Sequence, residues 1–278
     1  MQFHKVHGLG NDFILFDGRG LPPRDWNAAA TDLCDRRTGI GADGLLLVEN
    51  SETADLRMRI VNADGSEAEM CGNGIRCFAR YVYERDILPH PDMRIETLAG
   101  IIQPRLILEN GTVSGVRVDM GEPLLDCADI PVEGEGRCMD RVLTIFGKTL
   151  RLTCLRVGVP HAIVFTDDLE SLDIAVFGAA IEHAPIFPKR TNVDFVHVVN
   201  DRQIEMRTWE RGCGRTLCCG TGASSAAVAC ALHEKTGRSV EVLVERGALR
   251  IDWAEDNHVY MCGPAATAFI GEVCLPWE

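Results

Sequence analysis

Residues 56–77 read LRMRIVNADGSEAEMCGNGIRC, and residues 204–225 read IEMRTWERGCGRTLCCGTGASS. Laid over each other 148 residues apart, the two segments share Met-Arg near their starts and Cys-Gly-x-Gly near their ends, with no gap between. Internal repetition of this kind is typical of a chain that contains one folding unit more than once. We therefore predict two copies of one domain, with Cys71 and Cys219 at equivalent positions.

The match extends outward from these segments with small slips. Ala42-Asp43 resembles Val193-Asp194, and Gly10-Asn11-Asp12 before an apolar run resembles Val159-Pro160-His161 before another. The colinear order of the matching blocks argues against chance similarity between glycine-rich loops. The predicted domains are residues 1–120 together with 264–278, which hold Cys71, and residues 121–263, which hold Cys219.

The local patterns predict an α+β fold. Short alternating runs such as Arg57–Val61 indicate strands, and Asn110-Gly111 between apolar runs indicates a hairpin. A helical pattern follows each Cys-Gly-x-Gly. We expect two pseudo-symmetric domains, each built mostly of strands wrapped against one principal helix. A cleft between two such domains is a common place for a small-molecule site, and we expect the active site there.

Composition excludes several classes of function. The 278 residues are 46% apolar and 25% charged, as in a globular protein. The start of the chain has no apolar run of signal-peptide length, which favours the cytoplasm. The net charge of −13 repels phosphate backbones and anionic lipids, so we expect neither nucleic acid nor membrane as a partner. A homodimer stays open.

Twelve cysteines occur in the chain, and no pair has the CxxC spacing of a structural zinc site. In a reducing compartment we expect free thiols, most of them small buried hydrophobes. We predict no metal site. Only the duplicated position singles out Cys71 and Cys219, with Cys218 as a rival nucleophile beside the second.

A cysteine before a Gly-x-Gly helix start has chemical consequences. The first N–H groups of a helix lack partners and can hold an anion such as a carboxylate. The same position is expected to lower the pKa of a thiol. Two such elements could place one sulfur on each face of a substrate carbon. One thiolate would remove a proton and the opposite thiol would return one, which inverts the configuration.

These residues resemble the diaminopimelate epimerase family. The matching strings are HGLGNDF, GIGADGLL, NADGSEAEMCGNGIRC, TNVDFV and ERGCGRTLCCGTGA, spread in order over nearly the whole chain. The resemblance implies two pseudo-symmetric domains, each a strand-rich barrel around a central helix. It also implies conversion of LL-2,6-diaminopimelate to meso-diaminopimelate, in lysine and peptidoglycan precursor biosynthesis, without pyridoxal phosphate, metal or other cofactor.

The resemblance also assigns residues. It implies that Cys71 and Cys219 are the acid and base, with His161 and Glu210 near the reacting amine and the thiols. The reacting carboxylate would bind at two helix starts, Gly72-Asn73 and Gly220-Thr221. The distal amino-acid group would bind four residues, Asn11, Asn62, Asn192 and Arg211.

Three positions depart from the pattern usual in the family, and we expect them to bear on the distal contacts of the ligand rather than on the chemistry: Val159, Arg215 and Cys218. Other functions stay open. A racemase or epimerase of the same fold could act on proline, hydroxyproline or histidine. An isomerase of the PhzF type would lack the cysteine pair. A non-catalytic protein that binds an amino acid or a metal is the alternative outside enzymes.

Overall fold

The computed structural model describes residues 1–22 and 24–274. The chain forms two compact units, unit 1 (Met1–Val118 with Gly263–Glu278) and unit 2 (Asp119–Cys262). Each described unit combines many strands with few helices, so the predicted α+β class is confirmed. Among the described residues, no helix has both the length and the apolar character needed to cross a membrane.

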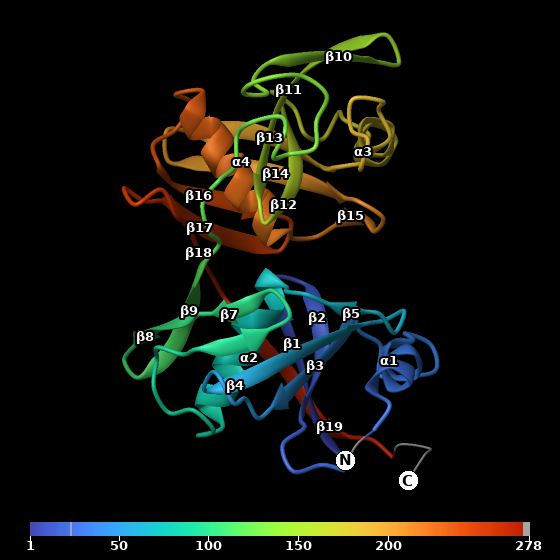
Figure 1. Ribbon diagram of the computed structural model, residues 1–278, viewed down its shortest axis with the longest axis vertical. Coiled ribbons are helices and arrows are strands. Elements are labelled where there is room, and N and C mark those ends of the chain that lie inside the picture. The colour runs from blue at the N-terminus through green and yellow to red at the C-terminus, as the bar shows by residue number, and fades with distance from the viewer. Residues whose placement is uncertain (23, 275–278) are drawn as a thin grey trace. The chain divides into compact units, whose positions relative to one another are not determined.

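Unit 1 contains a mixed sheet with the strand order β19-β1-β2-β3-β4-β6-β7, and β5 pairs with β4 (Figure 1). Neighbours are antiparallel except β2 with β3 and β4 with β6. The bounds are β1 (Gln2–Gly8), β2 (Asn11–Asp17), α1 (Trp26–Cys34), β3 (Gly44–Glu49), β4 (Leu56–Asn62), β5 (Glu67–Ala68), α2 (Gly72–Glu84), β6 (Ile95–Thr97), β7 (Gly100–Ile102) and β19 (Ala266–Glu272).

The predicted hairpin follows as β8 (Arg105–Glu109) and β9 (Thr112–Asp119). Its turn residues Asn110 and Gly111 have φ values of 52° and 77°. Positive φ at both central residues is what the two-residue hairpin turn requires, and Asn-Gly tolerates it best. The hairpin prediction is confirmed.

Unit 2 repeats this plan with the order β10-β11-β12-β13-β14-β16-β17-β18, and β15 pairs with β14. Here β12 runs parallel to β13, and β14 parallel to β16. The bounds are β10 (Arg141–Ile145), β11 (Lys148–Val157), β12 (Val159–Phe165), α3 (Ile174–Glu182), β13 (Asn192–Asn200), β14 (Gln203–Glu210), β15 (Gly214–Thr216), α4 (Gly220–Leu232), β16 (Ser239–Val244), β17 (Gly247–Trp253) and β18 (Val259–Gly263).

The internal repeat is therefore a repeat of structure. Three pairs of elements begin and end 148 residues apart: β2 with β12, α1 with α3, and α2 with α4. The parallel strand pairs also fall at equivalent places. Two neighbouring matches drawn from the sequence are wrong. Strand pairing joins Phe13 to Gly44 and His161 to Asn192, so Phe13 is equivalent to His161, and Gly44 to Asn192.

The reason for the error is physical. Short apolar strands look alike when shifted by a residue or more, whereas hydrogen-bond register is fixed by the turns at their ends. The slips introduced to align Asp43 with Asp194 and Asp12 with His161 do not exist in the fold. Equivalence by strand register instead places Leu46 opposite Asp194, which matters for the chemistry below.

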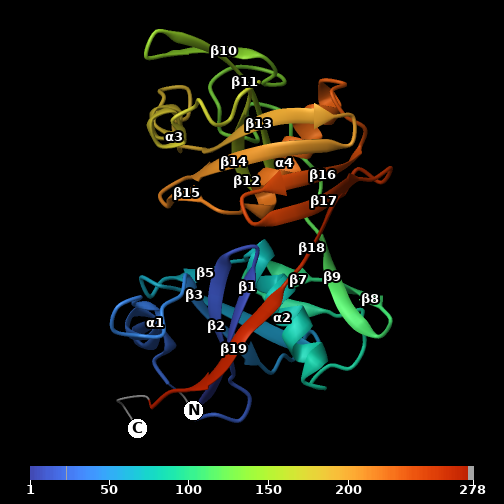
Figure 2. The same cartoon turned by 180° about the vertical axis from the view of Figure 1, so that it is seen from behind.

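The helix after each cysteine is the principal helix of its unit. In unit 1, α2 packs against β1, β2, β3, β4, β8 and β19. In unit 2, α4 packs against β11, β12, β13, β14, β16 and β17, and Figure 2 shows β13, β14 and β16 in front of it. Side chains such as Phe78 in α2 and Val228 in α4 have no exposed surface. Helices buried on most sides match the predicted strand-wrapped design.

Replacing Phe78 by Ala should test the role of α2 in the core. The ring is fully buried, so its loss leaves a cavity as well as lost contacts. We expect the free energy of unfolding to fall by about 3–5 kcal/mol. Urea denaturation followed by circular dichroism measures it. Arg85→Ala, at the exposed end of the same helix, should change it by less than about 0.5 kcal/mol. An equal loss of unfolding free energy in both variants would contradict the assignment of Phe78 to the core.

Candidate active site

In unit 1 the candidate site begins at the first residue before α2. Cys71 is the N-cap of this helix, with extended backbone, and its Sγ accepts the Gly74 N–H at 3.4 Å. The thiol lies 3.6 Å from Asn11 Oδ1, to which it can donate. Cys71 is half-buried, whereas the helix beyond it is buried. The sulfur thus stands at the helix start, as the sequence predicted.

Asn11 is held by a network of charges behind it. Its Nδ2 donates to Asp43 Oδ2 at 2.7 Å, and its Oδ1 accepts from Asn73 Nδ2 at 3.0 Å. Arg36 binds Asp43 at 2.8 Å and Asp12 at 2.7 Å. The amide of Asn11 therefore has one orientation, with its oxygen toward Cys71. The resemblance assigned Asn11 to the distal group, but in unit 1 it contacts the thiol.

Arg76 is a residue that the sequence analysis missed. Its side chain has no exposed surface, and it donates to Gly72 O and Asn73 Oδ1, both at 2.9 Å. A cation at this depth is stabilised by the carbonyl and amide oxygens at the start of α2. It fixes Asn73 and adds positive charge close to the N–H groups that would hold an anion. No sequence pattern singled out Arg76, because its burial is a result of packing.

In unit 2 the equivalent thiol belongs to Cys219, the N-cap of α4. It is 5% exposed, and its Sγ lies 3.3 Å from Thr221 Oγ1. Burial raises the pKa of this thiol well above its usual value, and the carboxylates of Glu210 and Asp194 raise it further. The expectation that a helix start lowers the thiol pKa is wrong for Cys219, because desolvation and nearby negative charge outweigh the helix dipole.

His161 is fully buried, as is the carboxylate that holds it. Its Nδ1 lies 2.6 Å from Asp194 Oδ2, and its Nε2 lies 3.0 Å from Thr221 Oγ1. Asn192 Nδ2 approaches the same Nε2 at 3.3 Å. The ring thus reaches Cys219 through one hydroxyl. Asp194, inside the TNVDFV string, was not among the predicted site residues.

Glu210 completes the surroundings of Cys219. Its Oε1 accepts from Thr216 Oγ1 at 2.6 Å. Burial raises the pKa of its carboxyl, the Thr216 hydroxyl opposes that shift, and the Cys219 thiol also opposes it as a hydrogen-bond donor. A carboxyl with a raised pKa holds its proton more readily, which suits a group that exchanges a proton with a neighbouring thiol or a substrate. In unit 2 the structure therefore brings together four of the predicted residues, Cys219, His161, Glu210 and Thr221.

The glycines of each helix start permit close packing beneath the sulfur. A Cβ on Gly222 would lie 2.5 Å from Asp194 Oδ1, and one on Gly74 would lie 3.2 Å from Leu46 Cδ2. Only glycine fits at the first of these positions without displacing the carboxylate. The Gly-x-Gly pattern in unit 2 therefore lets a helix start approach a buried acid, in addition to exposing its N–H groups.

The remaining predicted residues are less closely tied to the thiols. Asn62 Nδ2 donates to Ser66 Oγ at 2.9 Å, within a turn. Asn192 lies against His161, and its Oδ1 accepts the Arg211 N–H at 2.7 Å. The exposed guanidinium of Arg211 donates to Lys189 O at 2.9 Å. Arg211 thus follows the strand that ends at Glu210, with its charge directed to solvent.

The structure gives each of the three departures a defined place. Arg215 is exposed and binds Glu245 at 2.8 Å. Cys218, the rival nucleophile, is buried and precedes the N-cap, so the helix start belongs to Cys219. Val159 begins β12 and pairs with Val157.

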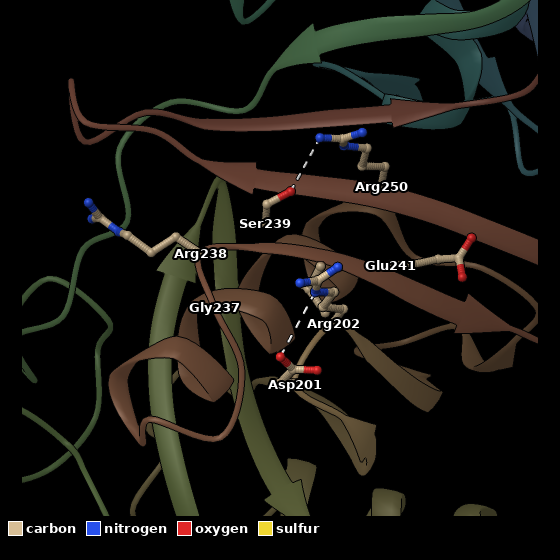
Figure 3. Close-up of a pocket in the computed structure, with 8 residues that line it drawn as sticks. Asp201, Arg202, Gly237, Arg238, Ser239, Glu241 and Arg250 are labelled. Atoms are coloured by element: carbon tan, nitrogen blue, oxygen red, sulfur yellow. Dashed lines mark hydrogen bonds and ion pairs between the residues drawn. The ribbon is translucent and has the colours of Figure 1, made fainter.

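A hollow elsewhere on unit 2 offers no comparable chemistry. Figure 3 shows charged and polar side chains around it, contributed by the β13–β14 turn, β16 and β17. Arg250 Nη2 donates to Ser239 Oγ at 3.4 Å, and Arg202 pairs with Asp201 at 3.9 Å. Its lining residues are Asp201, Arg202, Gly237, Arg238, Ser239, Val240, Glu241 and Arg250. These include neither a thiol nor an imidazole, so the cysteine-bearing helix starts remain the candidate site.

Comparison with known proteins identifies the family of this chain. The family model described as diaminopimelate epimerase matches residues 3–125 and 153–268. A diaminopimelate epimerase of Moorella thermoacetica is 52% identical over 278 residues, covering 99% of this chain and all of that one. The chain belongs to the diaminopimelate epimerase family. The predicted resemblance, and with it the prediction of an isomerase, is confirmed.

Further comparisons distinguish proteins of the same family from proteins that share only the fold. A diaminopimelate epimerase of Caldanaerobacter subterraneus is 50% identical over 274 residues, covering 98% of this chain and 99% of that one. A solved PhzF-family protein of Bacillus anthracis superposes with a TM-score of 0.72 but is 17% identical, over 99% of each chain. The second likeness shows that the two-domain fold is shared beyond diaminopimelate epimerases.

The raised pKa of Glu210 predicts how stability depends on pH. A carboxyl whose pKa is higher in the folded state binds its proton more tightly there, so stability falls as pH rises between the unfolded and folded pKa values. Glu210→Gln removes that penalty. We expect a higher Tm than wild type at neutral pH, with the difference vanishing in acid, measured by differential scanning fluorimetry across pH. A lower Tm at neutral pH would contradict burial of the charge.

Proposed function

We propose that this protein interconverts LL- and meso-2,6-diaminopimelate without a cofactor, with Cys71 and Cys219 as the paired acid and base. The observation that carries the proposal is the equivalence of the two thiols: each is the N-cap of the principal helix of its unit. Sequence identity of about half to diaminopimelate epimerases, over nearly the full length, supports the choice of substrate. The reaction is a step of lysine and peptidoglycan precursor biosynthesis.

The proposed chemistry uses the groups around each thiol. The N–H groups at Gly72-Asn73 and Gly220-Thr221 hold the reacting carboxylate, whose charge suits a helix N-terminus. One sulfur, as thiolate, removes the α-proton, and the other thiol delivers a proton to the opposite face. Glu210 binds the reacting ammonium, because a buried carboxyl gains a counter-charge there.

The distal end of the substrate is proposed to bind Asn62 and Arg211, with Asn11 and Asn192 at its edge. The guanidinium of Arg211 is exposed and can donate two parallel hydrogen bonds to a carboxylate. A substrate without a second charged end, such as proline, would leave these groups unpaired, which disfavours the alternative substrates. Cytoplasmic localisation and a homodimeric state remain predictions from the sequence.

Incubation of the protein with LL-diaminopimelate in deuterated water tests the proposal. We expect meso product with deuterium at one α-carbon, observed by NMR, and turnover unchanged by a metal chelator or by hydroxylamine, which traps pyridoxal phosphate. Cys71→Ser and Cys219→Ser should each lose at least about a hundredfold in kcat, because a hydroxyl is a far weaker base than a thiol.

Two results would reject this proposal. One is activity that disappears with either reagent and returns on adding back metal or pyridoxal phosphate. The other is racemisation of proline or histidine at a rate that exceeds turnover of diaminopimelate, which would assign the protein to another substrate within the same fold.

Arg211→Lys tests the distal contact. A planar guanidinium grips a carboxylate with two hydrogen bonds, which a point charge cannot reproduce. A charge-assisted bond of this kind contributes about 1.5–3 kcal/mol, so kcat/KM for diaminopimelate should fall at least about tenfold. Arg215→Lys, an exposed arginine paired with Glu245, is the matched control and should keep wild-type kinetics. An unchanged Arg211→Lys enzyme would place this residue outside the site.

A further inference from the structure

Asp194 is a buried carboxylate with only polar contacts to its two oxygens. The residue has no exposed surface. Its Oδ2 lies 2.6 Å from His161 Nδ1, and its Oδ1 accepts from Thr208 Oγ1 at 2.8 Å. A buried carboxylate is unfavourable unless such bonds compensate for lost hydration. The α4 helix start packs directly on it, since Gly222 leaves no room for a Cβ.

The neighbours of His161 define which ring nitrogen carries the proton. Asn192 Oδ1 accepts the Arg211 backbone N–H at 2.7 Å, so the amide of Asn192 turns its Nδ2 toward His161. That Nδ2 can only donate, and it lies 3.3 Å from Nε2. Nε2 is therefore an acceptor, and the ring proton lies on Nδ1, directed at Asp194.

A hydroxyl connects this ring to the thiol. Thr221 Oγ1 lies 3.0 Å from His161 Nε2 and 3.3 Å from Cys219 Sγ. With Nε2 as acceptor, the Thr221 hydroxyl can donate to the ring, and it accepts from the thiol when the S–H proton, which also lies within reach of Glu210, turns toward Thr221. The order of donors is then Cys219 to Thr221 to His161 to Asp194, a continuous path for one proton.

Among the described residues of unit 1, no equivalent of this path is found. By strand register, Phe13 is equivalent to His161 and Leu46 to Asp194, so two apolar side chains replace the hydrogen-bonded pair of His161 and Asp194. Cys71 meets the amide of Asn11 instead, and Asn73 is equivalent to Thr221. The path from thiol to carboxylate is thus specific to Cys219. It is not a consequence of the repeated fold.

We propose that Asp194 is a positioning residue that sets His161 to accept the proton of Cys219 through Thr221. The inference deepens the proposed function. The Cys219 S–H proton moves to Thr221 Oγ1 as the Thr221 hydroxyl proton moves to His161 Nε2. The products are a thiolate and an imidazolium, whose positive charge the Asp194 carboxylate stabilises. The reverse transfer restores the thiol, so no oxidant, reductant or co-reactant is consumed.

Asp194→Asn provides a test in which two explanations predict opposite signs. The Asp194 charge by itself raises the pKa of Cys219, so removing a mere neighbouring charge would make the thiol more reactive. Removing the partner of His161 deprives the imidazolium of its counter-charge, so the thiol should become less reactive. We expect Cys219 of the variant to react with iodoacetamide about tenfold more slowly than wild type at neutral pH.

The measurement is the rate of carboxamidomethylation of Cys219 in the full-length protein, followed by peptide mass spectrometry across neutral and alkaline pH. No substrate is present, so the result does not depend on the proposed epimerisation. Faster or unchanged alkylation in Asp194→Asn would overturn the inference. Failure of the wild-type protein to epimerise diaminopimelate would reject the proposed function and leave this result standing.

Two further variants keep the test decisive. Glu182→Gln removes another buried carboxylate of unit 2, which binds Trp209 Nε1 at 2.7 Å, and should leave Cys219 reactivity at the wild-type value. Thr221→Val breaks the path but keeps the His161–Asp194 pair, and should slow alkylation as Asp194→Asn does. If Asp194→Asn does not fold, Thr221→Val decides the question, because normal reactivity there would refute the relay.

Discussion

In each unit, the start of the helix after the cysteine packs closely against a strand side chain, and this close packing constrains the site. A sulfur at the N-cap gains the uncovered N–H groups of the first turn only if the next residues leave the backbone exposed. In unit 2 the packing is closest, because the Gly222 Cα meets the Asp194 carboxylate directly. In unit 1 the same approach meets Leu46. The fold thus fixes the thiols and leaves their surroundings free to differ.

The side chains around the helix start differ between the two units. The backbone carbonyl at the first helical residue accepts from Arg76 in unit 1 and from Ser224 Oγ in unit 2. A buried cation therefore lies under one helix start, and a small hydroxyl occupies the equivalent place under the other. The buried cation of unit 1 thus binds the helix start that follows Cys71, whereas the carboxylates of Glu210 and Asp194 raise the pKa of Cys219 in unit 2. The groups around the two helix starts therefore differ in charge.

The amino-acid sequence was sufficient for the features set by spacing. An ungapped match over 22 residues located both helices and both N-caps, and Asn110-Gly111 located a hairpin, because these depend on local chemistry alone. Beyond the helices the predicted register was wrong, because the slips departed from the constant offset of 148 residues that the fold keeps. Asp43 and Asp194 were aligned because they are identical residues, yet strand pairing shows that they are three positions apart. The sequence of a short apolar strand looks similar when it is shifted by a few residues, so it does not reveal the shift.

The sequence also concealed which polar residues are buried. Arg76 and Asp194 look like surface charges in isolation, and only packing shows that neither is exposed. The prediction of a lowered thiol pKa was wrong for Cys219 for the same reason. The helix start argues for a lower value, but its effect is modest, and desolvation depends on neighbours distant in sequence. Effects that arise from burial can be predicted only when the three-dimensional structure is known.

Burial also explains why the Cys219 thiol and the Glu210 carboxyl favour their protonated forms in the free protein. The thiol keeps its proton, and the raised pKa of Glu210 favours the protonated acid. The tautomer of His161 inferred above is neutral. An ionised group here would lack hydration, so the folded protein is more stable with its protons in place. An amino-acid zwitterion brings an ammonium and a carboxylate together, and the ammonium is the counter-charge that an ionised Glu210 lacks. Binding of substrate would then permit the ionisation that the free protein disfavours, which ties formation of the thiolate to the presence of the carbon it attacks.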